Sequence, residues 1–192
     1  PTELKVTLAT GQTTTLLSGA TYYPFGAVSR WTYSNGGILR RSLNQNYQPG
    51  FVEDTAPGGI SEGYSFDAAG WHFISLNSSS QLAQRNPGSP QYEWLLKDLK
   101  ASTSQCTVVF IHNPIFSVGR LGGDDRLIHI WAALAQNGVE MVLSGNDHDY
   151  QRWQPLNAAG SPEAGGTVPF VVGTGGQGIR DFVSTDARLA KG

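Results

Sequence analysis

The chain has 192 residues and a formal net charge of −2, with 39% hydrophobic and 10% aromatic residues. This length fits one domain with a sizeable core, and the hydrophobic content excludes a chain that is disordered throughout. The near-neutral charge leaves no basic field to hold a nucleic acid or an anionic membrane surface, so we expect neither as a partner. Charged residues make up only 15% of the chain, and small polar residues and 24 glycines replace them. Such a weakly charged polar surface favours a secreted or extracellular protein.

Residues 1–60 are expected to form an irregular N-terminal region with short strands. Alternation at Leu4, Val6 and Leu8 predicts one strand, and residues 13–17 predict a second. From Ser18 to Ile60 periodicity is weak, and Gly-Gly and Pro-Gly pairs interrupt the chain. We therefore expect residues 18–60 to form a long ordered loop or an interaction surface for a homo-oligomer or another assembly. The chain starts at Pro1 with no signal-like apolar region, as a processed, trimmed or incomplete chain would.

Residues 61–192 have the pattern of an α/β domain. Two β-rich runs around Ala68-Ala69-Gly70 predict a hairpin, and Ser89-Pro90 is a typical helix start. The continuous apolar run at 106–111 predicts a strand that is covered on both faces. A helix over 124–137 and strands at 139–143 and 168–172 follow. Because helices alternate with strands, we expect a largely parallel central sheet with flanking helices, and one domain overall.

Polar residues follow two of these strands, where ligands bind in such sheets. His112-Asn113-Pro114 comes directly after the strand at 106–111, and residues 145–150, Gly-Asn-Asp-His-Asp-Tyr, follow the strand at 139–143. Imidazole is the commonest transition-metal ligand, and Asn or Asp oxygens can complete a site. From spacing alone, the alternative remains open that the two histidines only form hydrogen bonds within their loops.

Three segments resemble the calcineurin-like metallophosphoesterases, specifically the purple-acid-phosphatase-like secreted bacterial group. They are VVFIHNPIFSV at 108–118, VLSGNDHDYQRW at 142–153 and FVVGTGGQGI at 170–179, and WHFISLN at 71–77 and SPQYEWLLKDL at 89–99 follow the same order of elements. The resemblance covers about residues 60–182. It implies a layered α/β sandwich, a phosphoester substrate and a centre of Fe, Mn or Zn that activates water.

The same resemblance assigns roles to individual residues. His112 matches a metal-ligand histidine that lies two positions before a proline, and His148 matches the second histidine of a Gly-His-x-His motif. Asn146 stands where that motif has its first histidine. Tyr150 and Arg152 match a Tyr-x-Arg that lies near the metals. We expect Asn113, beside His112, to lie near the metals as well.

The N-terminal half of the family's ligand set has no match in this chain. The aspartates before His112 are Asp54, Asp67 and Asp98, and none lies in a family motif; no Asn-His pair occurs. The chain therefore offers two matched ligands, or three with Asn146, which is too few for a two-metal centre.

Other candidates are expected to be structural. His72 and His129 are interpreted as packing or surface residues, and Asp124-Asp125 as a helix cap. Gly173–Gly176 is interpreted as a tight turn, and Ser117 has no base partner that would make it a nucleophile. Cys106 is the single cysteine, so no disulfide forms within the chain; in the related group a partner for it stands where this chain has serines.

Three interpretations remain. The first is a metal-dependent phosphoesterase whose missing ligands lie on another segment or chain. The second is a degenerate member that lost hydrolysis, binds no metal, and serves as a structural or binding module of an extracellular assembly. The third is a site for one metal on His112, Asn146 and His148. The second, or the first with impaired activity, fits the altered ligand positions best.

Overall fold

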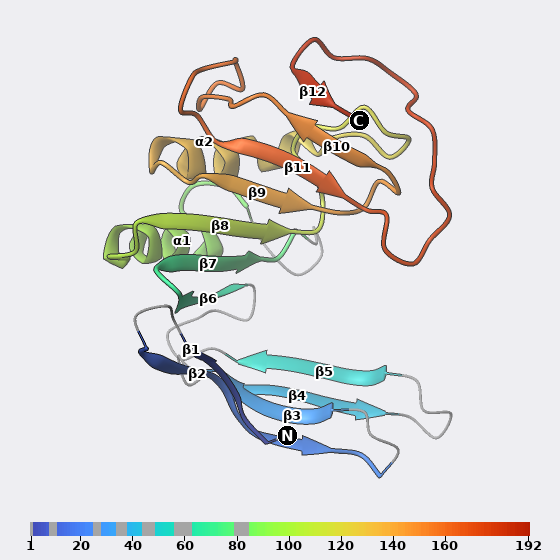
Figure 1. The fold of residues 1–192 in the computed structure, drawn as a ribbon. Coiled ribbons are helices and arrows are strands. Elements are labelled where there is room, and N and C mark those ends of the chain that lie inside the picture. Colours follow the sequence, from blue (N-terminus) through green and yellow to red (C-terminus); the bar gives the residue numbers. More distant parts are fainter. Residues whose placement is uncertain are drawn as a thin grey trace.

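The computed structural model describes residues 2–7, 11–24, 28–33, 38–43, 49–55, 63–78 and 85–192. In these ranges the chain forms two β-sheets and two α-helices (Figure 1). The N-terminal sheet consists of β1 (Leu4–Thr7), β2 (Thr13–Tyr22), β3 (Val28–Tyr33), β4 (Ile38–Leu43) and β5 (Pro49–Thr55). The second sheet consists of β6 (Gly63–Ala68), β7 (Trp71–Leu76), β8 (Cys106–Ile111), β9 (Met141–Ser144), β10 (Tyr150–Trp153), β11 (Val168–Val172) and β12 (Leu189–Lys191). The helices are α1 (Pro90–Ala101) and α2 (Ile128–Gln136), the latter preceded by a 3-10 turn, η1 (Asp125–Leu127).

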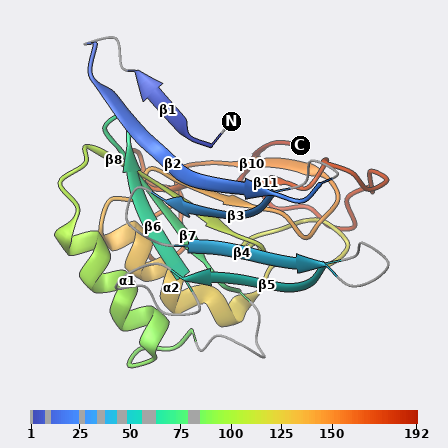
Figure 2. The ribbon, with the colours of Figure 1, turned by 90° about the horizontal axis from the view of Figure 1, so that it is seen from below.

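The N-terminal strands pair in chain order, each antiparallel to the next, so the sheet is a simple meander. Figure 2 shows the five strands running side by side. The expectation of a long loop over residues 18–60 was therefore wrong for the described part of that segment. None of the ten residues of β2 is buried. Because this strand has no buried face, its sequence lacks the polar–apolar alternation by which strands are recognised. The remainder of 18–60 lies outside the described residues.

The second sheet has the order β12-β10-β11-β9-β8-β7-β6. The four central strands β7, β8, β9 and β11 are parallel neighbours, whereas β6, β10 and β12 pair antiparallel. The predicted hairpin and the predicted strands at 106–111 and 168–172 are confirmed, and so is the mixed α/β fold with a largely parallel centre. None of the described helices is long and apolar enough to cross a membrane.

Local signals explain where the helices begin and end. The Ser89 side chain accepts a hydrogen bond from the Tyr92 amide, and Pro90 occupies the first turn of α1, as predicted. Asp124 caps η1 by accepting from the Arg126 amide, which confirms its interpretation as a cap. Gly138 follows α2 with φ +70°, a conformation that ends helices and favours glycine.

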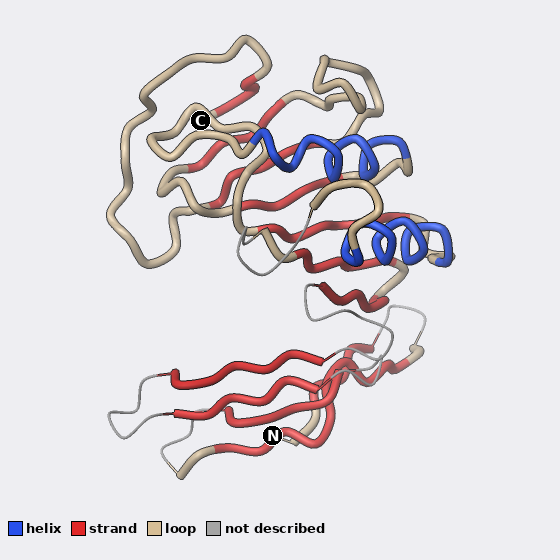
Figure 3. Tube along the Cα trace, turned by 180° about the vertical axis from the view of Figure 1, so that it is seen from behind, coloured by secondary structure: helices blue, strands red, loops and turns tan. Residues whose placement is uncertain are grey.

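Both helices lie on the same face of the seven-stranded sheet. They are behind the sheet in Figure 1 and in front of it in Figure 3, which is seen from behind. The main hydrophobic core fills the space between this face and the helices; its members include Ile74, Leu95, Val109, Ile130, Trp131, Leu134 and Val142.

The other side of the sheet, which we call the open face, differs from the prediction for 106–111. Residues Val109 and Ile111 of β8 point into the core, but Phe110 points the other way and is 40% exposed. Among the described residues no helix lies over this side (Figure 1). Helices therefore cover β8 on one face only, although Val108 on the other face is buried by its neighbours.

Candidate functional site at the carboxyl ends of β8 and β9

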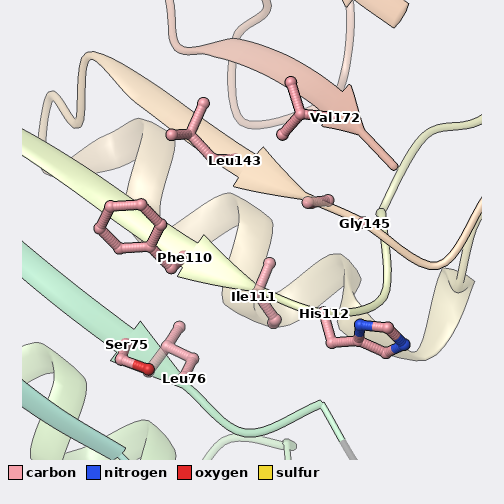
Figure 4. Close-up of a pocket in the computed structure, with 9 residues that line it drawn as sticks. Ser75, Leu76, Phe110, Ile111, His112, Leu143, Gly145 and Val172 are labelled. Carbon is pink, nitrogen blue, oxygen red and sulfur yellow. The ribbon is translucent and has the colours of Figure 1, made fainter. Parts of the chain in front are cut away.

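The candidate site lies where β8 and β9 end side by side. The Gly145 amide donates to the His112 carbonyl oxygen at 3.0 Å, which ties the loop after β9 to the loop after β8. His112 is exposed, and its ring lies at one end of a shallow pocket of about 430 Å³ on the open face (Figure 4). The rest of the lining comes from β7, β8, β9 and β11 and the residue after β9, and it is mostly apolar, with Phe110, Leu143 and Val172 among its members.

Asn146 turns the backbone sharply at the start of the second loop. Its φ is +66°, in the left-handed region, and it is one of two non-glycine residues with positive φ in the described chain. Asparagine tolerates this conformation better than most residues because its short polar side chain clashes little with the backbone. Histidine is also enriched there, so the residue that the resemblance leads one to expect at 146 would fit the same turn.

The carboxylate of Asp147 points into the protein. Asp147 is 1% exposed. It accepts hydrogen bonds from the Ser117 hydroxyl and from the amides of Leu121 and Gly122, the latter two at 2.6 and 3.1 Å. Three donors thus satisfy this buried negative charge. Asp147 holds the loop 117–122 against the loop 145–149 instead of facing the pocket.

Asp149 is the second buried carboxylate of this loop. It is 3% exposed, and one of its oxygens accepts from the Gln151 amide group at 2.9 Å. Its other oxygen, Oδ2, is buried and has no partner among the described residues. Burial raises the pKa of Asp149, and the negative charge of Asp147 adds to this, whereas the Gln151 hydrogen bond opposes it.

Two glycines allow the loops to pack this closely. A Cβ on Gly119 would lie 2.4 Å from the Asp147 Cγ and 2.5 Å from the Asp149 Oδ2. A Cβ on Gly173 would lie 1.7 Å from the Asp147 carbonyl oxygen. Gly173 is therefore required by close backbone approach, which agrees with its interpretation as part of a tight turn.

The other predicted site residues have varied environments. The ring nitrogen Nδ1 of His148 is buried and has no partner among the described residues. The Asn113 side chain accepts a hydrogen bond from the Ser78 hydroxyl at 2.7 Å, so it is held by the neighbouring strand end. Tyr150 and Arg152 are exposed on β10. The structure thus joins the loop of His112 to the loop of Asn146–His148. The Asn113 side chain binds Ser78 instead, and Arg152 is exposed to solvent.

The described residues do not fit a two-metal centre. Within the described ranges, no group of three or more His, Cys, Asp or Glu side chains is arranged to hold a metal ion. The two carboxylates beside His148, which could have supplied oxygen ligands, are buried in contacts with the protein. Among the described residues at this edge, the imidazoles of His112 and His148 and the Asn146 amide remain as candidate ligands.

The sequence analysis missed the buried network beneath the loop. Besides its bond to Asp147, the Ser117 hydroxyl accepts from the Gln151 side chain at 2.9 Å, and the Gln151 Oε1 accepts from the Val118 amide at 3.1 Å. These partners are about 30 positions apart in the chain, so no local motif reveals them.

Comparisons with known proteins support the same kinship. No family model matches the chain. Purple acid phosphatase 18 of Arabidopsis thaliana is 26% identical over 174 residues, covering 82% of this chain and 38% of that protein. Purple acid phosphatase 21 of the same plant is 31% identical over 120 residues (59% of this chain, 26% of that protein). Probable inactive purple acid phosphatase 9, also from Arabidopsis, is 28% identical over 124 residues (59% and 19%).

A solved structure gives the same result for the fold. The purple acid phosphatase PPD1 from yellow lupin (Lupinus luteus) seeds superposes with a TM-score of 0.55 at 20% identity, over 66% of this chain and 25% of that one. The chain is therefore similar to purple acid phosphatases in sequence, and its fold is metallophosphoesterase-like. It spans less than two fifths of the length of each of these relatives. The metallophosphoesterase relationship expected from the sequence is thus supported, and purple acid phosphatases are the relatives that carry it.

Proposed function

We propose that this chain is a metallophosphoesterase-like domain in which phosphoester hydrolysis is impaired or absent. The observation that supports the proposal is the poor donor set at the strand ends: within the described ranges no three His, Cys, Asp or Glu side chains are grouped to hold a metal ion, and Asp147, the carboxylate beside His148, is bound by Ser117 and two loop amides. Asn146 adds to this, because an amide oxygen replaces the imidazole expected there. The name of one relative, probable inactive purple acid phosphatase 9, agrees with such a domain.

The role proposed for His112, Asn146 and His148 is at most weak binding of one transition metal such as Fe, Mn or Zn. A two-metal phosphoesterase needs ligands on both ions to clamp the attacking and leaving oxygens of the phosphate. Three candidate ligands, one of them a neutral amide, cannot fill two coordination spheres. A structural or binding module outside the cell is the role that remains for the fold, and secretion is proposed from the weakly charged surface.

Metal content and activity measured on the same preparations test the proposal. The protein is purified without chelator, and Fe, Mn and Zn per chain are measured by elemental mass spectrometry. Hydrolysis of p-nitrophenyl phosphate is then measured with each metal added. We expect well below one equivalent of metal and no turnover above the buffer rate. Close to two equivalents together with metal-dependent hydrolysis would overturn the proposal.

The variant Asn146→His tests whether position 146 faces a metal. An added imidazole at this edge is expected to tighten Zn²⁺ binding at least tenfold, about 1.4 kcal/mol, in a competition titration. Asn86→His is the matched control, because Asn86 is exposed in the turn before α1, far along the chain from the candidate ligands. Equal Zn²⁺ affinity in both variants would show that position 146 does not face a metal.

A further inference from the structure

A buried ionisable residue that the candidate site does not use lies at the other end of the seven-stranded sheet. His72 is the second residue of β7, whereas the candidate site follows the last residues of β8 and β9. Because side chains alternate along a strand, His72 shares a face of β7 with Ile74, which belongs to the core. A buried imidazole is costly unless its nitrogens are hydrogen-bonded, so its partners determine what this residue can do.

Two carboxylates hold the His72 ring from opposite sides. Nδ1 is 2.8 Å from Asp67 Oδ1 on β6, and Nε2 is 2.8 Å from Asp98 Oδ2 on α1. The side chain of Asp67 is 66% exposed and that of Asp98 is 17% exposed. The Ser65 hydroxyl donates to Asp98 Oδ1 at 2.7 Å. The Ser104 hydroxyl donates to Asp67 Oδ1 at 3.0 Å, so Asp67 also ties the loop after α1 to the β6–β7 hairpin.

The two aspartates are the charged groups that act on the ring in the described part of the chain. The other elements around His72 present uncharged side chains, Thr107 of β8 and Thr14 of β2. Glu140 binds the Thr107 amide, and Lys97 and Lys100 are exposed on α1. Burial is the largest single influence on the pKa of His72 and lowers it, but the hydrogen bonds and charges of Asp98 and Asp67 together raise it above 6.5.

Loss of a proton from His72 to solvent breaks one of its two contacts. A neutral imidazole has one N–H and one bare nitrogen, and the bare nitrogen cannot bond to a carboxylate oxygen. Asp98 is the more buried partner, so separation from the ring would leave its charge poorly solvated. Asp67 can turn toward water at little cost because its side chain is mostly exposed. The remaining proton therefore stays on Nε2, and Asp67 is the partner that is released.

Asp67 forms part of the wall of a cavity at the junction of the two sheets. The cavity has a volume of about 360 Å³, and its lining comes from β6, β7, the end of α1 and Thr14 of β2. In Figure 1, β6 is the strand of the second sheet next to the N-terminal strands. Tyr64 of β6 stacks on Tyr33 of β3 with ring centroids 5.3 Å apart. A change at Asp67 therefore acts where the two sheets meet.

We propose that His72 is a pH-sensitive latch at this junction: the charged ring holds Asp67 and, through it, Ser104, whereas the neutral ring releases both and opens the cavity to solvent. The ring stays bound to Asp98 in both states, so the latch opens without unfolding α1 or the hairpin. The proposal does not depend on whether the domain hydrolyses phosphoesters or binds a metal, because the latch and the candidate site lie at opposite ends of the strands.

Nitrogen NMR of the imidazole rings tests which partner is released. Protein labelled with 15N-histidine is titrated from about pH 5.5 to about pH 9.5, a range that spans the change of charge of a histidine. Single His→Gln variants assign the signals of the four histidines. We expect His72 to be doubly protonated at the low end and to carry its proton on Nε2 at the high end. A proton on Nδ1 at the high end would mean that Asp98 is released, which would overturn the latch.

The Hα–Hβ couplings of Asp67, measured in D2O, test the release directly because they report its χ1 rotamer. We expect one rotamer at low pH, and a fall of about two- to fivefold in its population relative to the others at high pH, as for the loss of a partly exposed ion contact. In His72→Gln this pH dependence should disappear, whereas His129→Gln, an exposed substitution on α2, should retain it. Circular dichroism checks that both variants are folded, and the wild-type measurements decide the question if His72→Gln is not.

Two further outcomes would contradict the latch. A His72 ring that keeps one charge state over the whole pH range would remove the switch. Couplings of Asp67 that are the same at both ends of the range, while His72 changes its charge, would show that the ring titrates without releasing its exposed partner.

Discussion

His72 provides the sharpest test of the energetics in this fold. Its ring is 5% exposed and lies between two carboxylates: Nδ1 is 2.8 Å from Asp67 Oδ1 and Nε2 is 2.8 Å from Asp98 Oδ2. Both nitrogens face carboxylate oxygens, and this arrangement favours the doubly protonated, positively charged form of the ring. Burial alone lowers the pKa of His72, but the hydrogen bonds to Asp98 and Asp67 outweigh it, and the pKa is raised. This clamp joins β6, β7 and α1.

The exposure of the two aspartates determines how much their contacts with His72 stabilise the fold. The Asp67 side chain is 66% exposed, so its contact is screened by water and worth about 0–1 kcal/mol. The Asp98 side chain is 17% exposed, and a charged hydrogen bond there is worth about 1.5–3 kcal/mol. We therefore expect His72→Gln to lower the free energy of unfolding at pH 5.5 by about 2 kcal/mol, or Tm by roughly 4–8 °C for a chain of this length.

The pH dependence distinguishes charge from packing. Because the folded-state pKa of His72 is raised, its contribution is fully present below the unfolded-state pKa of about 6.5 and is lost as pH rises through the folded-state value. Denaturant unfolding of wild type and His72→Gln at pH 5.5 and pH 9 should show a smaller difference at pH 9. His129→Gln, exposed on α2, is the control and should change neither value. A difference that is equal at both pH values would refute the charged clamp.

Two further substitutions test contacts near the site. Gly173→Ala should destabilise the fold by more than about 3 kcal/mol, because its Cβ would overlap a loop carbonyl. The control in thermal melts is Gly175→Ala, since a Cβ at Gly175 would meet open space. Equal Tm values for the two variants would contradict the close approach at Gly173. Arg85→Met should cost about 1.5–3 kcal/mol in urea unfolding, because it removes a charged hydrogen bond of 3.0 Å between side chains that are 6% and 7% exposed, while Arg126 still binds Asp124. The exposed Arg120→Met should be neutral, and a similarly small loss at position 85 would show that the buried pair adds nothing.

The elements that sequence predicted well are those with local physical signals. The start of α1 follows from a serine cap and a proline, and the 71–76 strand of the hairpin follows from residues that alternate between core and open face. The apolar run of β8 also predicted its strand correctly, and only the cover over Phe110 differed. That difference depends on what packs against the sheet, which the residues of one strand do not specify.

The parts that sequence missed depend on distant partners or on polar strands. β2–β4 have few buried side chains, so their hydrogen-bonded pairing leaves almost no trace in hydrophobic periodicity. At the candidate site, the sequence indicated residues 112 and 145–150, whose loops the structure joins, but it did not indicate the inward orientation of Asp147. That orientation is set by Ser117, 30 positions earlier, and becomes visible only when the two loops are folded together.

The position of β11 has a consequence for the shape of the candidate site. In the sheet β11 lies between β9 and β10, although both of those strands precede it in the chain. In the folded sheet β9 and β10 therefore lie about 9–10 Å apart, and residues 168–172 occupy the space between them. The loop 145–149 bridges that gap, and Gly173, directly after β11, is the residue that packs on its backbone. The loop that carries Asn146 and His148 thus has its full set of native contacts only when β11 is in place, so the shape of the candidate site depends on a strand that comes later in the chain.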